Sequence, residues 1–190
     1  MLAYLVLLVA VLSRILPHAF HAVSWNFTAL GGGLLFFGSR MGGPKRAAWM
    51  LPSALAVLMA TDYYLTVFAY QYPFQVRTYL VTWIWYAAVC LLGMGILRKP
   101  TLLRVAAGVL ASSTSFFLIS NFMVWFAGSI AMYPHSLVGL GACYIAGLPF
   151  YRNDLVSTAI TAGALFGLPA LAARIAESLR AARHTNLPLA

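Results

Sequence analysis

The chain has 190 residues, of which 63% are hydrophobic and 8% are charged, and its formal net charge at pH 7 is +9. Soluble domains are only about 45–50% apolar, so this composition excludes a water-soluble globular protein and indicates one integral membrane domain spanning 1–190. The basic excess comes without a helix of interleaved cations and aromatic residues, so nucleic acid is excluded as a partner.

Six apolar runs predict an all-α membrane protein with six transmembrane helices. They cover residues 1–16, 23–38, 47–68, 79–97, 105–127 and 155–173. Pro17 is expected to end the first helix, and Pro52 can kink the third. The second run is shorter than the roughly 20 residues of an upright span, and it contains three consecutive glycines, Gly31 to Gly33. We therefore expect a thin or irregular helix that another helix approaches closely.

The distribution of cations predicts how these helices are oriented. The loops 39–46 and 98–104 and the tail after Ala173 each hold three Lys or Arg, and the remaining three cations are Arg14, Arg77 and Arg152. Cytoplasmic loops of membrane proteins carry the excess of Lys and Arg. We therefore expect both termini in the cytoplasm, and we place the chain in a bacterial inner membrane with the lipid bilayer as a partner.

Residues 128–154 are predicted to form a lid on the outer face. Within them, the apolar run 135–150 is bounded by Pro134 and Pro149 and is too short and too rich in glycine for an ordinary span. Non-helical backbone at membrane depth is tolerated where it is covered by protein or lines a cavity. We therefore expect this run to lie on the outer face or to dip into it as a re-entrant segment.

The tail 174–190 is expected on the cytoplasmic side. Leu171, Ile175 and Leu179 recur at helical spacing with arginines between them. That pattern is typical of a helix lying in the plane of a membrane surface. The sequence thus predicts that the sixth helix continues along the cytoplasmic surface.

Asp62 lies in an apolar run, where an ionised side chain costs at least roughly 2.5–3.5 kcal/mol if it faces lipid. It should therefore face the bundle and pair with a cation such as Arg14 or Arg77. One alternative is an ion pair that only fixes helix packing.

The other polar and aromatic residues predicted at the outer end converge as in a ligand pocket, although many of the aromatic residues could instead be interface anchors. Asn121 and Trp125 share one face of the fifth helix, where the indole offers a flat wall and the amide both a donor and an acceptor. The candidate substrate-binding residues are Arg14, Trp25, Asn26, Asp62, Trp83, Asn121, Trp125, Tyr133, His135, Tyr144 and Arg152.

No catalytic, metal or cofactor site is predicted. His18 and His21 have too few companion ligands for a metal site. Cys90 and Cys143 lack a CxxC spacing and an adjacent histidine base. The chain is therefore not expected to be an enzyme.

Several motifs resemble those of an uncharacterised family of small bacterial inner-membrane proteins. They are Ser13-Arg14-Ile15-Leu16-Pro17-His18, Trp25-Asn26-Phe27-Thr28-Ala29-Leu30-Gly31-Gly32, Thr61-Asp62-Tyr63-Tyr64, Asn121-Phe122-x-Val124-Trp125, Tyr133-Pro134, Cys143-Tyr144 and Leu148-Pro149-Phe150. That family in turn is similar to the substrate-binding S components of energy-coupling-factor (ECF) transporters. The resemblance implies six helices, an outward-opening ligand pocket and an energising transmembrane and ATPase module as partner, which Ala3 and Ala10 on one helix face could contact.

The leading functional hypothesis is therefore a membrane protein that binds a small vitamin-like or heterocyclic molecule for uptake. The alternative is a structural or assembly subunit of a larger membrane complex, in which the same outer residues contact a protein.

Overall fold

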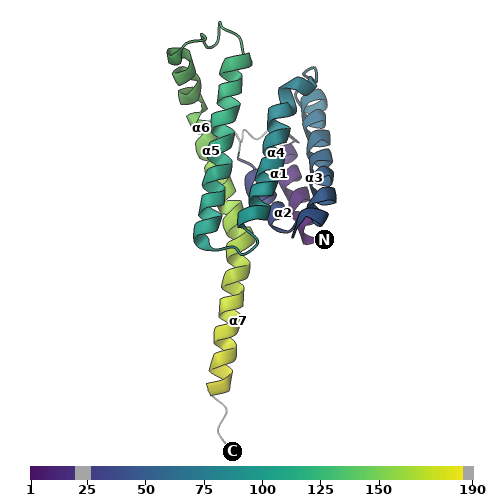
Figure 1. Cartoon of the computed structure of the whole chain (residues 1–190), viewed down its shortest axis with the longest axis vertical. Helices are drawn as coiled ribbons and strands as arrows, with labels where there is room; N and C mark the ends of the chain where they lie inside the picture. Colours follow the sequence, from purple (N-terminus) through teal and green to yellow (C-terminus); the bar gives the residue numbers. More distant parts are fainter. Residues whose placement is uncertain (20–26, 186–190) are drawn as a thin grey trace, which may run out of the picture.

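The computed structural model describes the backbone of residues 1–19 and 27–185 and the side chains of residues 1–15 and 27–180. Within these ranges the regular structure is entirely helical and forms six continuous helices (Figure 1). They are α1 (Leu2–Ala19), α2 (Leu30–Ser39), α3 (Pro44–Tyr64) with the π-helical turn η1 (Leu65–Ala69), α4 (Val76–Ile96), α5 (Leu102–Ala127), and α6 (Leu137–Ala162), which continues through the π-helical turn η2 (Gly163–Gly167) into α7 (Leu168–Thr185). The predicted all-α fold is confirmed for this part of the chain.

Four of the six helices in the described ranges are long and apolar enough to cross a membrane, with mean hydropathies between 1.3 and 1.7. They are α3 with η1, α4, α5, and the long helix that begins with α6. Helix α1 continues through Pro17, contrary to expectation, because a proline in the last turn removes only one backbone hydrogen bond. Helix α2 has 10 residues and is about 15 Å long, half the thickness of a hydrocarbon core. It therefore does not cross a membrane alone.

Helix α2 occupies the centre of the bundle. All its residues from Leu30 to Gly38 are buried, and it packs against α1, α4 and α6. Each glycine of the triplet faces a neighbouring helix: a methyl group on Gly33 would meet Ala10 of α1, and one on Gly31 or Gly32 would meet α6. The prediction that the glycines mark a close approach by other helices is confirmed.

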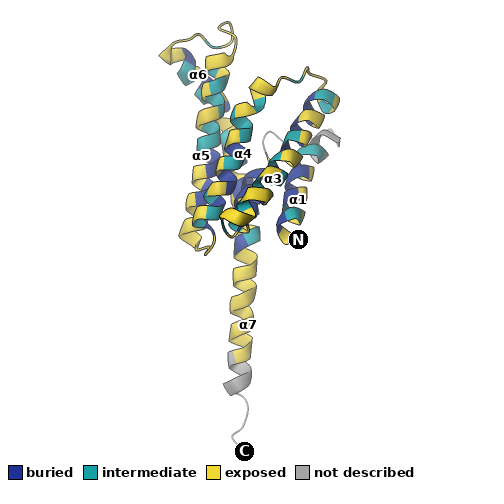
Figure 2. Ribbon diagram, turned by 45° about the vertical axis from the view of Figure 1, so that its right-hand side comes forward, coloured by how far each residue is buried: buried dark blue, intermediate teal, exposed yellow. Residues whose placement is uncertain are grey.

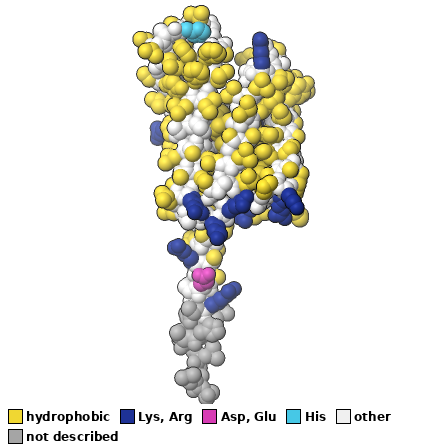
Figure 3. Space-filling view, viewed as in Figure 1, with side chains coloured by type: hydrophobic (Ala, Val, Ile, Leu, Met, Phe, Trp, Pro, Cys, Tyr) yellow, Lys and Arg dark blue, Asp and Glu magenta, His cyan; other side chains and the backbone are white. Residues whose placement is uncertain are grey.

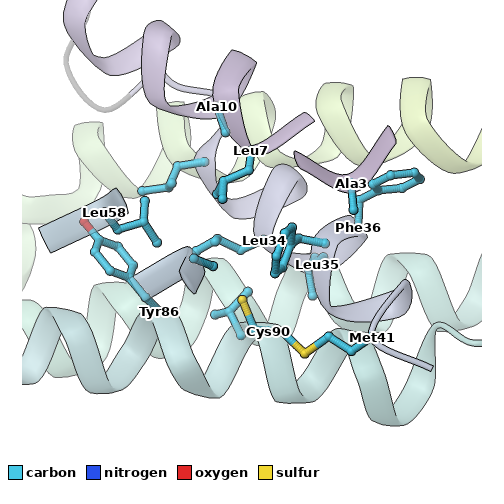
Figure 4. Close-up of a cluster of buried hydrophobic side chains, with 14 of the residues drawn as sticks. Ala3, Leu7, Ala10, Leu34, Leu35, Phe36, Met41, Leu58, Tyr86 and Cys90 are labelled. Carbon is cyan, nitrogen blue, oxygen red and sulfur yellow. The ribbon is translucent and has the colours of Figure 1, made fainter. Parts of the chain in front are cut away.

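The contact between α2 and α4 is made by backbone against backbone. A methyl group on Gly38 would strike the carbonyl of Cys90, and one on Gly93 would strike the carbonyl of Leu35. Around this contact lies one buried cluster, drawn in Figure 4, whose labelled members are Ala3, Leu7, Ala10, Leu34, Leu35, Phe36, Met41, Leu58, Tyr86 and Cys90. Ala3 and Ala10 are thus covered by this chain's own helices, which corrects the expectation that they offer a face to a partner.

The predicted lid is mostly the first half of α6. This helix begins at Leu137, where the hydroxyl of Ser136 accepts a hydrogen bond from the Gly139 N–H at 3.2 Å, and it continues through Pro149. Gly147 does not break the helix, because it serves a close approach to Asn121 of α5. The run 135–150 is therefore not a separate re-entrant segment, and only residues 128–136 connect α5 to α6.

The two ends of the molecule differ in charge. Six cations, Arg40, Lys45, Arg46, Arg98, Lys99 and Arg104, flank the loops that join α2 to α3 and α4 to α5, and Figure 3 shows this basic end where α7 leaves the bundle. The sides of the bundle are a broad hydrophobic belt. Buried residues gather where α1 to α6 meet, whereas α7 projects beyond the bundle and is exposed over its described side chains (Figure 2).

Candidate functional site

An ion pair joins α1 to α3. Arg14 donates from Nη2 to Oδ1 of Asp62 at 2.5 Å, and the Asp62 side chain is 1% exposed. Asp62 lies near the end of α3 and faces the interior because α3 buries Leu58, Thr61 and Asp62 on one face. Of the two partners expected from the sequence, the structure selects Arg14.

Helix α4 completes the hydrogen bonding of this carboxylate. The Trp83 indole N–H donates to Oδ2 of Asp62 at 2.9 Å, and the Tyr86 hydroxyl donates to Oδ1 at 3.3 Å. The guanidinium of Arg14 also lies 5.9 Å from the ring centre of Tyr86, although its Nη1 is buried without a hydrogen-bond partner. Tyr86 was not among the residues predicted for the site, although its i, i+3 spacing from Trp83 places both side chains on one face of α4. The cluster is electrically neutral, and it connects three helices.

A second group of predicted residues closes the hairpin between α5 and α6. Trp125 donates from Nε1 to the Pro134 carbonyl at 2.9 Å, and its ring lies 5.4 Å from that of His135. The Tyr144 hydroxyl donates to the Leu118 carbonyl at 2.9 Å. These contacts lie within the hairpin itself.

Asn121 belongs to the same hairpin. It donates from Nδ2 to the carbonyl of Phe117 at 2.8 Å, and its side chain lies against Gly147 of α6. Tyr133 is half-buried in the connection between the two helices. The structure therefore brings these predicted residues together in one hairpin. The side chains of Asn121, Trp125 and Tyr144, however, donate their hydrogen bonds to backbone carbonyls of the hairpin.

Three predicted residues contribute no contact to either group of the described structure. Arg152 is exposed on α6, eight residues beyond Tyr144, and forms no hydrogen bond or ion pair within the described part of the chain. Trp25 and Asn26 lie outside the described residues. The predicted residues thus form two groups, one on α1, α3 and α4 and one on α5 and α6.

Between these two groups lies a cleft of about 700 Å³ that separates α4 from α5. Figure 3 shows the surface hollowed at the end of the bundle opposite the basic end. The lining includes the polar residues Gln75, Arg77, Thr78, Thr82 and Ser120 and the apolar residues Val81, Trp85, Phe116, Ile119 and Met123. None of the predicted site residues that the structure describes lines it. The sequence did contain a pattern that could have indicated these two walls. Thr78, Thr82 and Trp85 follow i, i+4, i+7 spacing and so share one face of α4, and Phe116, Ser120 and Met123 do the same on α5.

The walls of the cleft are anchored by α4 and α5. Trp85 is 5% exposed, donates from Nε1 to Oγ of Ser115 at 3.1 Å, and packs with its ring 4.6 Å from that of Phe116. Among the described residues, the lining holds one charged side chain, Arg77, and no carboxylate. The arrangement can hold a ring against an apolar wall, offer it hydroxyl groups, and attract a negative charge at Arg77.

A smaller crevice of about 20 Å³ lies between α5 and α6 and is lined by Ser113, Asn121 and Asp154, among others. Asp154 is 9% exposed and has no ion-pair partner among the described residues. The Ser113 hydroxyl faces this carboxylate but does not form a hydrogen bond of good geometry with it. The crevice has room for about one water molecule.

No group of three or more His, Cys, Asp or Glu side chains within the described ranges is arranged to hold a metal ion. Cys90 and Cys143 are buried free thiols. The candidate site is therefore a binding cleft next to a neutral polar cluster, and its chemistry is that of hydrogen bonding, stacking and one exposed cation.

No curated protein and no solved structure matches the chain. A family model matches residues 1–180, almost the whole length, and its description is "Family of unknown function (DUF6580)". That extent agrees with the resemblance to an uncharacterised family. The chain therefore belongs to the family of unknown function DUF6580.

Proposed function

We propose that this protein binds a small, ring-containing molecule in the cleft between α4 and α5 and serves its uptake across a membrane. The observation that carries the proposal is the cleft itself, which at about 700 Å³ has the size of a small-molecule site. Helices α4 and α5 pack together from the basic end to the contact of Trp85 with Ser115 and Phe116, and they diverge beyond it toward the other end (Figure 1). A ligand could therefore enter from the end of the bundle opposite the basic end.

The lining indicates the chemical class of the ligand. Trp85 and Phe116 supply an apolar aromatic wall, and Thr82 and Ser120 supply hydroxyl groups that can both donate and accept hydrogen bonds. Arg77 at the cleft favours a carboxylate or another single negative charge, and no acid opposes it among the described residues of the lining. A neutral or monoanionic heterocycle fits these groups best.

The proposed cellular setting follows the distribution of charge. We place the basic end in the cytoplasm of a bacterial inner membrane, with both termini on that side, and the cleft opening outward. Resemblance to ECF S components supports an energising membrane partner. Because Ala3 and Ala10 are covered internally, that partner would contact another surface. A cysteine introduced at Gln75 should react with an impermeant reagent in intact cells, and one at Gly43 should not; the reverse pattern would invert the orientation.

Ligand-dependent thermal stability of the full chain in nanodiscs tests the proposal. We would measure the unfolding temperature with matched pairs such as nicotinate and nicotinamide, within a panel of vitamins that includes thiamine, riboflavin, biotin and pyridoxine. A ligand at 100 times its Kd stabilises the folded protein by about 2.7 kcal/mol. Thr82→Leu should remove a hydroxyl group from the wall of the cleft, place a larger apolar side chain there and abolish the shift, whereas Ala88→Leu on the exposed face of the same helix should keep it. A shift that survives Thr82→Leu, or a panel without any shift, would contradict a binding cleft.

One observation favours the alternative, an assembly subunit. Arg152 is exposed on the apolar surface of α6 without an ion-pair partner within the described residues, and intramembrane cations usually meet a partner. Asp62 and Asp154 are buried, so a second copy does not offer their carboxylates at a surface. Photocrosslinking from position 152 in native membranes would support this function if it captured one defined protein in an Arg152-dependent manner.

A further inference from the structure

Helix α7 exposes an apolar stripe that nothing in the described chain covers. Leu171, Ile175 and Leu179 are 55%, 50% and 60% exposed, and they follow one another at i, i+4, i+8. Among the described elements α7 packs against η2, the turn that precedes it. The stripe therefore projects beyond the bundle (Figure 1).

The charged residues of α7 are placed around this stripe in a defined order. At about 100° per residue, Arg174 lies about 100° from the centre of the stripe on one side and Arg180 about 140° on the other, and Glu177 lies between the two arginines on the opposite face. Arginines in such flanking positions can rest their aliphatic stems on an apolar boundary and hold their guanidinium groups at its polar edge. The order is typical of a helix that lies in a membrane interface.

The length of the helix places α7 outside the hydrocarbon core. The continuous helix from Leu137 to Arg180 has 44 residues and is about 66 Å long, more than twice the roughly 30 Å of a bilayer core. If α6 crosses the membrane, α7 emerges at the basic end. An α7 that continued straight would hold its apolar stripe in water.

A structural weak point lies where α7 leaves the bundle. The π-helical turn η2 begins and ends with glycine, at Gly163 and Gly167, and a methyl group at either position would meet no atom within 4 Å. Pro169 follows at once, and its ring conflicts with the carbonyl four residues earlier, which widens or bends a helix. Bending at η2 is therefore unobstructed by side-chain packing at its glycines.

We propose that α7 turns at η2 and lies on the anionic surface of the membrane at the basic end, with Leu171, Ile175 and Leu179 among the acyl chains and Arg174 and Arg180 at the lipid phosphates. This partner matches in charge, because the loops at that end add six cations and no acid. A second copy of the chain would bring the same positive charges and would be repelled. An anionic bilayer is thus the partner that complements both the stripe and the cations.

The test measures lipid contact at single positions of α7 in the full-length protein. A nitrobenzoxadiazole dye is attached to Leu179→Cys, on the stripe, or to the matched control Ala173→Cys, on the polar side, with Cys90 and Cys143 replaced by alanine. The proteins are reconstituted in vesicles of phosphatidylglycerol and phosphatidylcholine that contain nitroxide-labelled acyl chains. We expect strong quenching and blue-shifted emission at position 179 and neither at position 173.

Three comparisons decide the outcome. In vesicles of phosphatidylcholine alone, the ratio of surface-bound to free α7 should fall. In the anionic vesicles, replacing Arg174→Gln and Arg180→Gln together should lower the same ratio by about fivefold for each lost arginine. Gly163→Ala with Gly167→Ala should stiffen η2 and also reduce quenching at position 179. The proposal would be overturned by equal emission at both positions or by quenching that does not depend on phosphatidylglycerol. A blue shift at position 179 that rises with protein density and not with anionic lipid would overturn it in favour of a second copy of the chain.

Discussion

Replacing Gly93 by alanine is expected to destabilise the protein, because α2 and α4 touch there through their backbones. The added methyl would lie 3.0 Å from the carbonyl carbon of Leu35 and closer still to its oxygen, whereas ordinary contact begins near 3.4 Å. The carbonyl carbon alone would require the helices to separate by about 0.4 Å, and the closer oxygen requires more. Neither partner is a flexible side chain that could move aside. Overpacking of this kind costs about 1–3 kcal/mol, against which the better helix propensity of alanine returns about 1 kcal/mol.

Gly95→Ala is the matched control, on the same helix and two residues away. Gly95 is exposed, and a methyl group there would meet no atom within 4 Å, so this variant should be stabilised by about 0.5–1 kcal/mol. Thermal unfolding in nanodiscs, followed by circular dichroism, should therefore move in opposite directions for the two variants. Equal unfolding temperatures would refute the idea that α2 and α4 are held at backbone contact.

Other substitutions test the polar interior by the same measurement. Arg14→Met should lower the free energy of unfolding by about 3–5 kcal/mol, because it leaves the Asp62 carboxylate buried without its cation. Adding Asp62→Asn should recover much of that loss, and strictly additive effects of the two substitutions would contradict the pairing. Trp83→Phe should cost about 1.5–3 kcal/mol through loss of the 2.9 Å hydrogen bond to Asp62, whereas Trp49→Phe at an exposed position should change little. Asp154→Asn should leave stability unchanged or raise it by about 1 kcal/mol, since it removes an ion from a site without an ion-pair partner in the described chain; a marked loss would show that the charge itself is bound.

The sequence by itself determined the features that depend on local pattern and composition. Hydropathy predicted an all-helical chain with apolar helices long enough to cross a membrane, and the glycine triplet indicated that another helix comes close to α2. The cost of a charge in an apolar environment required a cation for Asp62. The clustering of Lys and Arg in two loops and the tail anticipated one basic end, because helices that alternate in direction bring alternate loops to the same end (Figure 3).

Only the tertiary structure decided which elements meet. Both α1 and α4 pack against α3, but Arg77 is exposed at the cleft between α4 and α5, whereas Arg14 contacts Asp62. No periodicity in the sequence encodes that choice. Prolines and glycines in the run 135–150 suggested a broken segment, yet α5 packs against these residues and stabilises the helix, so tertiary contacts override intrinsic propensity. The α4 to α5 cleft depends on how two helices diverge, which is a property of the whole bundle. Packing therefore created the cleft from residues that are unremarkable along the chain.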